Sequence, residues 1–142
     1  MIARYSLPKM SNIWQDDFKF KTMLDIEILA LEALSRKKNI PPAVVKRVKK
    51  KARFNINEIR KLEEKTQHDV VAFVANIAQY IGPDAKYLHL GLTSSDILDT
   101  TLGVQLRCAS DILLEDLNRL LKVLAKKARS YKDMVCIGRT HG

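Results

Sequence analysis

The chain has 142 residues, of which 46% are hydrophobic and 29% charged, a composition typical of one soluble domain. Five Gly and four Pro are too few for a collagen-like or disordered chain, and no apolar stretch approaches the roughly 18 residues of a membrane span. With 25 Lys and Arg against 16 Asp and Glu, the formal net charge is +9, which favours an anionic partner or substrate.

The first nine residues lack the continuous apolar segment of a secretory signal, so a cytoplasmic location is expected. The two cysteines, Cys108 and Cys136, are far apart in the sequence and have no metal-ligand neighbours at zinc-finger spacing. We interpret both as reduced structural thiols.

Apolar residues recur at helical spacing through most of the chain, which predicts an all-α fold. The first helix is expected over residues 16–37. A second begins at Pro41 and Pro42 and carries a run of cations to Arg53, a pattern typical of a solvated helix face. A third is expected to begin near Asn57, as its N-cap, and to end near Thr66.

The next helix, over residues 70–81, is apolar almost all round and is expected to be buried. A loop over residues 86–92 then leads to Thr93 and Asp96, whose spacing matches the capping box that begins a helix. That helix is expected to continue to about Tyr131, as a rod of about 50 Å.

A domain this small cannot cover the leucine seam of such a rod, so its far half is expected to pack against other helices. Residues 134–142 are expected to form a short extended piece that ends in a loop. We therefore divide the chain into an N-terminal helical domain, residues 1–92, and the first long helix of a bundle domain, residues 93–142. The boundary could lie as late as about residue 111.

Several polar clusters lie at the boundaries of these elements, where functional sites are usually built. His68 with Asp69, and Thr93 with Ser94, each stand at a helix start, so each pair could cap the helix or bind an anion. Arg4 and Tyr5 could bind a phosphate or lie on the surface, and His141 stands between Thr140 and a glycine that would let a ligand approach closely. The histidine spacing gives no support to a metal site.

Four motifs resemble, in order and spacing, those of the adenylosuccinate lyase family within the fumarase and aspartase superfamily. They are Arg4-Tyr5-Ser6, Thr66-Gln67-His68-Asp69-Val70-Val71-Ala72-Phe73, His89-Leu90-Gly91-Leu92-Thr93-Ser94-Ser95-Asp96 and Gly138-Arg139-Thr140-His141-Gly142. The last two are specific for the superfamily, and the first two narrow it to the enzyme of purine synthesis. The resemblance spans the chain from Met1 to Gly142.

The resemblance implies a homotetramer of mostly helical subunits around a long helical bundle. It implies elimination of fumarate from adenylosuccinate and from succinyl-aminoimidazole-carboxamide ribotide, with AMP as one product and with no metal or organic cofactor. Neither nucleic acid nor a membrane is implied as a partner.

The resemblance also assigns roles to individual positions. It makes His141 the general acid and His68 a second catalytic histidine. The implied substrate-binding residues are Arg4, Tyr5, Gln67, His68, Asp69, Thr93, Ser94 and Thr140.

Two departures from the family pattern stand out. Gln67 occupies a position at which the family commonly has Arg, so the charge-pairing role of that arginine does not carry over to this chain. The family's general base is a serine on a mobile downstream loop that nothing here matches. The resemblance therefore implies the N-terminal part of the enzyme, which is expected to be inactive alone.

Two alternatives remain open at this point. A sibling lyase of the same superfamily, such as argininosuccinate lyase or a cycloisomerase, would share the last two motifs. The cationic run over residues 46–53 and the net charge would also suit a basic helical nucleic-acid-binding module.

Overall fold

The computed structural model describes residues 2–37 and 39–141, and every regular element within them is helical. The all-α fold class is thus confirmed. The α-helices are α1 (Pro8–Ser11), α2 (Asp16–Arg36), α3 (Pro42–Lys51), α4 (Ile56–Thr66), α5 (Asp69–Ile81) and α6 (Ser94–Ser130). Three short 3-10 helices, η1 (Ala3–Tyr5), η2 (Asn12–Trp14) and η3 (Gly82–Tyr87), join them.

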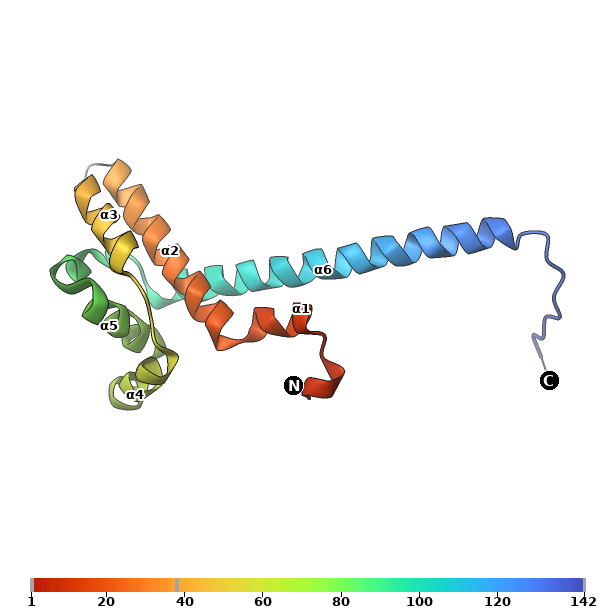
Figure 1. The fold of residues 1–142 in the computed structure, drawn as a ribbon, viewed down its shortest axis with the longest axis horizontal. Helices are drawn as coiled ribbons and strands as arrows, with labels where there is room; N and C mark the ends of the chain where they lie inside the picture. Colours follow the sequence, from red (N-terminus) through yellow and green to blue (C-terminus); the bar gives the residue numbers. More distant parts are fainter. Residues whose placement is uncertain (1, 38, 142) are drawn as a thin grey trace.

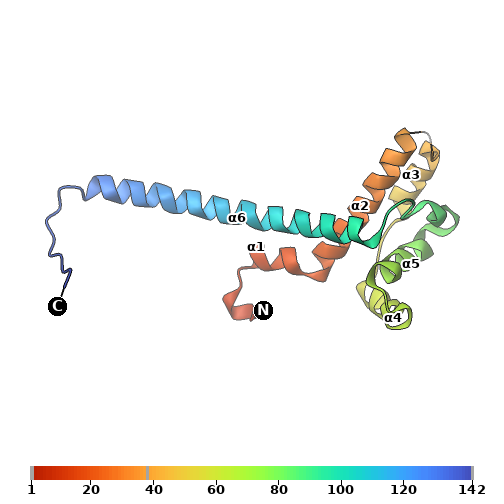
Figure 2. The same ribbon diagram turned by 180° about the vertical axis from the view of Figure 1, so that it is seen from behind.

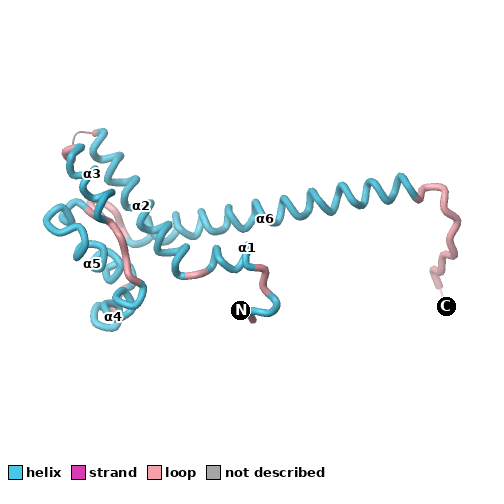
Figure 3. Tube along the Cα trace, in the orientation of Figure 1, coloured by secondary structure: helices cyan, strands magenta, loops and turns pink. Residues whose placement is uncertain are grey.

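The helices form a head and a rod. Helices α2 to α5 cluster at one end of the molecule, and α6 projects from that cluster as one continuous helix (Figures 1 and 2). The N-terminal segment with α1 runs back along the first half of α6, where the buried Gln105 amide donates to the Ile13 carbonyl at 2.7 Å. Irregular chain is confined to short connections and to the segment after α6 (Figure 3).

The core lies inside the head, between α2, α3, α4 and α5. Its aromatic centre is Phe20 of α2, whose ring stacks on Phe73 of α5 at 5.7 Å and lies 6.0 Å from Phe54. Apolar side chains from every helix of the head, from the connection between α2 and α3 and from the start of α6 close around these rings, because each amphipathic helix turns its apolar stripe inward. Those that are fully buried include Met23, Leu31, Ile40, Val48, Ile59, Val70, Ile77, Ile81 and Ile97.

The helix bounds agree with the sequence predictions to within one or two residues, with one error in capping. Helix α4 begins after Asn55 rather than Asn57, because the Asn55 side chain accepts the backbone N–H of Glu58 at 3.1 Å. Helix α3 ends at Lys51, two residues before the expected Arg53, where Ala52 turns into extended backbone. The helices before residue 16 were not predicted.

The far half of α6 lies uncovered, as expected from its length. Leu113, Leu117 and Leu120 are 55%, 60% and 52% exposed, whereas Ile97 and Ala109, nearer the head, are buried. Residues 134–141 form no regular structure and are exposed, and Gly142 lies outside the described residues. None of the described helices is both long enough and apolar enough to cross a bilayer.

Candidate functional site

His68 stands at the junction of α4 and α5, and its position is set by local hydrogen bonds. Its backbone is extended, and its Nδ1 accepts the backbone N–H of Val71 at 3.4 Å, so that the imidazole caps α5. The Thr66 hydroxyl donates to the His68 carbonyl at 3.1 Å. The capping role that the sequence left open is therefore real, and it fixes the direction of the ring.

The other face of this imidazole meets the start of α6. Nε2 of His68 lies 3.5 Å from Oγ of Ser94, although the two residues are 26 positions apart. Because Nδ1 accepts the Val71 N–H, the neutral ring carries its hydrogen on Nε2 and donates toward Ser94. The structure thus brings together two residues that the sequence had placed in separate clusters.

Thr93 and Asp96 form the predicted capping box at the start of α6. The Asp96 carboxylate accepts the Thr93 N–H at 2.7 Å and the Thr93 hydroxyl at 3.2 Å. These contacts occupy both hydrogen-bond donors of Thr93. The donors that remain at this helix start are the Ser94 hydroxyl and the backbone N–H groups of Ser94 and Ser95, because the Thr93 side chain already accepts the Asp96 N–H.

Gln67 and Asp69 flank His68 in different ways. Gln67 has φ 51° and ψ 31°, a left-handed conformation that ends α4, and its side-chain amide donates to the Glu64 carbonyl at 2.7 Å. The Asp69 carboxylate accepts the N–H of Val70 at 2.7 Å and lies 3.5 Å from Nδ1 of His68. Asp69 is half-exposed and lies next to the imidazole, whereas the exposed Gln67 side chain folds back onto the last turn of α4.

A contact between the buried Glu27 and the partly buried His89, which sequence reasoning missed, supports the loop before α6. Glu27 of α2, only 1% exposed, accepts the backbone N–H of His89 at 2.9 Å and approaches its Nδ1 to 2.6 Å. The sequence does indicate that Glu27 has a buried partner, because this residue falls on the apolar face of α2 between Met23 and Leu31. A carboxylate on such a face requires a buried donor.

A small hollow of about 250 Å³ lies beside the His68 and Ser94 contact. Its walls are mostly apolar side chains of α5, with His89 and Ser94 at its rim. Across residues 2–37 and 39–141, no group of three or more His, Cys, Asp or Glu side chains could hold a metal ion.

Arg4 and Tyr5 lie well away from His68. The Arg4 guanidinium sits 4.8 Å from the centre of the Tyr5 ring, and both side chains are exposed. Tyr5 borders a groove against α6 near Leu113, about 28 Å along that helix from Ser94 at 1.5 Å per residue. Within one chain, the structure does not bring Arg4 and Tyr5 close to His68 and Ser94.

Thr140 and His141 lie beyond the opposite end of α6. The helix has 37 residues, which at 1.5 Å each separates its ends by about 55 Å. His141 is exposed, and its carbonyl accepts the Arg139 Nε at 3.3 Å. Within one chain, therefore, His68 and His141 cannot contact the same small molecule.

Comparison with known proteins gives three kinds of similarity. The sequence model of a family described as lyase matches residues 3–142. The chain is 43% identical to the adenylosuccinate lyase of Synechocystis sp. and 46% identical to that of Bacillus subtilis, in each case over all 142 residues. A third adenylosuccinate lyase, from Staphylococcus saprophyticus, is 42% identical over the same length.

The chain spans only 33% of the length of each of these relatives. In structure it is similar to a fumarate lyase from Mesorhizobium sp. BNC1, with a TM-score of 0.87 over 96% of this chain and 33% of the other. The sequence identity of that pair is 24%, so the likeness concerns the fold.

Proposed function

Because the chain belongs to the lyase family, we propose that it supplies part of the active site of an adenylosuccinate lyase. The reaction eliminates fumarate from adenylosuccinate and from succinyl-aminoimidazole-carboxamide ribotide. The similarity to three adenylosuccinate lyases over the whole chain supports this choice of reaction. The main observation that supports this location of the site is the contact between His68 and Ser94 at the start of α6.

The start of α6 is suited to a succinyl carboxylate. Its first backbone N–H groups and the positive end of the helix dipole stabilise an anion. Nε2 of His68 donates to Oγ of Ser94, so the Ser94 hydroxyl can turn its own hydrogen toward the substrate. Thr93, already held by Asp96, lies next to Ser94 at the same helix start, and Gln67 and Asp69 would contact the substrate from the segment that contains His68.

These donors would act on the charge that builds during elimination. Removal of the proton from the carbon beside the carboxylate converts that carboxylate into an aci-carboxylate with more negative charge on its oxygens. Donors already aimed at those oxygens stabilise the transition state more than the ground state. No metal or organic cofactor is needed for this stabilisation.

His141, positioned by the loop that contains Thr140, would protonate the nitrogen that leaves. That role needs the imidazole within hydrogen-bond reach of the nitrogen. Because about 55 Å of helix separates it from Ser94 in one chain, a complete site joins His141 of one copy to His68 of another. Arg4 and Tyr5 would bind the phosphate end of the nucleotide.

The exposed leucine face of α6 supports an assembly in which such copies meet. Leu106, Leu113, Leu117, Leu120 and Leu124 are each about half exposed, an apolar stripe that is costly in water. We assign this stripe to the helical bundle of a homotetramer and place the enzyme in the cytoplasm. Residues 1–92 then form the head domain and residues 93–142 the first part of the bundle domain.

The test is fumarate release from adenylosuccinate by the whole gene product, followed by absorbance. We expect turnover by the whole product and none by the 142-residue chain alone, since nothing in these 142 residues matches the serine loop that supplies the family's general base. Ser94→Ala should slow turnover by about 10²-fold or more, the usual effect of removing a donor to a developing anion. Unchanged turnover in that variant would overturn the proposed site.

A further inference from the structure

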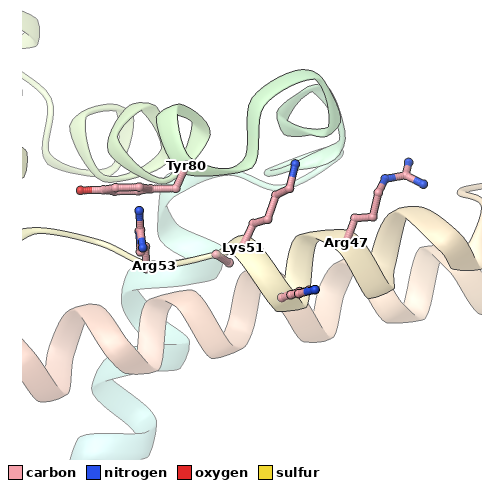
Figure 4. Close-up of a pocket in the computed structure, with 6 residues that line it drawn as sticks. Arg47, Lys51, Arg53 and Tyr80 are labelled. Carbon is pink, nitrogen blue, oxygen red and sulfur yellow. The ribbon is translucent and has the colours of Figure 1, made fainter.

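A second concave surface lies at the other end of α5 from His68. It is a hollow of about 700 Å³ between the last turns of α3, the segment that follows α3, and Tyr80 of α5 (Figure 4). Its lining residues are Arg47, Lys50, Lys51, Ala52, Arg53 and Tyr80. Four of the six are cations and none is a carboxylate, and the proposed elimination uses none of them.

One of the four cations already has a partner. Arg47 donates from Nε and from a terminal nitrogen to the two oxygens of Asp84, at 2.6 and 2.9 Å. This paired contact is the strong form of an arginine–carboxylate interaction and neutralises Arg47. Among the described residues, no carboxylate lies within 4.0 Å of the charged nitrogens of Lys50, Lys51 or Arg53.

Arg53 is held in place by the ring of Tyr80. Its guanidinium lies 4.5 Å from the centre of the Tyr80 ring (Figure 4). The Tyr80 hydroxyl donates to Glu58 at 2.9 Å. The buried Asn76 also donates to Glu58, at 2.8 Å, and accepts the N–H of Asn55 at 2.9 Å. The cation is therefore positioned by side chains that leave its N–H groups available to a ligand.

The Glu58 carboxylate, hydrogen-bonded to Tyr80, keeps its negative charge and offsets part of this positive field, but it does not line the hollow. The Tyr80 and Asn76 hydrogen bonds lower the pKa of Glu58, whose charge they already bind. The hydrogen bond to Glu58 raises the pKa of Tyr80, so the phenol stays neutral at physiological pH. The dipole of α3 favours lysines in its last turn, but Arg53 lies beyond that helix and gains nothing from it.

We propose that this hollow binds the triphosphate group of a small anionic ligand. Three cations without carboxylate partners match the three to four charges of a triphosphate better than the one or two charges of a single phosphate. The positioned guanidinium supplies planar, paired donation to phosphate oxygens, and the two lysines supply mobile point charges. Inorganic triphosphate and a nucleoside triphosphate share this chemistry.

The experiment is calorimetric titration of the chain with inorganic triphosphate, with a nucleoside triphosphate and with orthophosphate at 0.15 M ionic strength. We expect saturable binding of one triphosphate per chain and much weaker binding of orthophosphate. Tighter binding of the nucleoside triphosphate would show that a base is also recognised, and equal binding that only the phosphates are. Absence of saturable binding of both triphosphates would overturn the proposal.

Two double variants that remove the same charge distinguish specific binding in the hollow from non-specific attraction to the positive charge of the chain. Lys50→Gln/Lys51→Gln removes two cations from the hollow, and Lys122→Gln/Lys126→Gln removes two exposed cations from α6. We expect the first to weaken triphosphate binding by about tenfold or more, which is about 1.4 kcal/mol, and the second by less than twofold. Equal weakening in both variants would contradict the proposal, as would tight binding of a single-stranded oligonucleotide without binding of triphosphate.

Discussion

Glu27 and His89, 62 residues apart in the sequence, meet inside the head through two contacts. One carboxylate oxygen accepts the His89 backbone N–H at 2.9 Å, and the other lies 2.6 Å from Nδ1 of the imidazole. His89 has φ 57°, in the left-handed region, and stands five residues before Ser94. The pair therefore anchors to α2 the loop that delivers Ser94 to His68.

Removal of the Glu27 carboxylate is expected to destabilise the chain. Glu27→Ala leaves two donors of the partly buried His89 without acceptors, which costs about 2–4 kcal/mol of unfolding free energy. Urea unfolding followed by circular dichroism measures this change. Asp25→Ala, at an exposed position of the same helix, should change stability by less than about 0.5 kcal/mol. Equal effects of the two substitutions would show that the Glu27 contacts contribute nothing.

The capping residue of α4 can be identified by a pair of substitutions. Asn55→Ala removes the side chain that accepts the Glu58 N–H and should cost about 1 kcal/mol. Asn57→Ala, two residues later and exposed, should be nearly neutral. Thermal unfolding of both variants decides between them, and a larger loss for Asn57→Ala would contradict the structure.

Two glycines should respond to the same substitution with opposite signs. Gly91 has φ 75° and open space around a new Cβ, so Gly91→Ala is destabilising by about 1 kcal/mol through backbone strain alone. Gly103 lies inside α6, also with open space, and Gly103→Ala should stabilise by about 0.5–1 kcal/mol. Chemical unfolding measures the change in unfolding free energy for both variants. If both substitutions stabilise the chain, or both destabilise it, the backbone conformations assigned to Gly91 and Gly103 are contradicted.

The ion pair between Arg47 and Asp84 gives a pH dependence of known sign. The Arg47 guanidinium lowers the pKa of Asp84 in the folded chain, so the pair stabilises the fold above the unfolded pKa of about 3.9. This contribution is lost as pH falls through the lower, folded pKa. The difference in urea midpoint between wild type and Asp84→Asn should be constant near neutral pH and should shrink below pH 4. A difference that grows on acidification would reverse the assignment.

The long helices could be predicted because their apolar residues keep one period over many turns. Helices α2 and α6 agree with prediction to within one residue, and the box formed by Thr93 and Asp96 begins α6 as expected. The exact cap of α4 could not be predicted, because Asn55 and Asn57 are equally good capping residues. The choice between them depends on Asn76, which binds the Asn55 N–H from α5.

The candidate site shows the same division between local and long-range information. His68 and Ser94 could each be selected from local sequence, since each stands at a helix start. Their contact at 3.5 Å depends on how α5 and α6 meet in the head, which periodicity does not encode. The separation of His68 from His141 follows once α6 is known to be unbroken, and it makes a site within one chain impossible.

The central claim is that one active site combines His68 and Ser94 of one copy with His141 of another copy. The most direct measurement is the adenylosuccinate cleavage rate after two inactive variants of the whole gene product are unfolded, mixed and refolded together. A mixture of His68→Ala and His141→Ala should regain activity well above either variant. Some sites in the mixed assembly then combine an intact His68 from one variant with an intact His141 from the other. A mixture of His68→Ala and Ser94→Ala should stay inactive, because one copy contributes both residues to each site and every site therefore carries one of the two substitutions. If the first mixture stays as inactive as its components, the claim is contradicted.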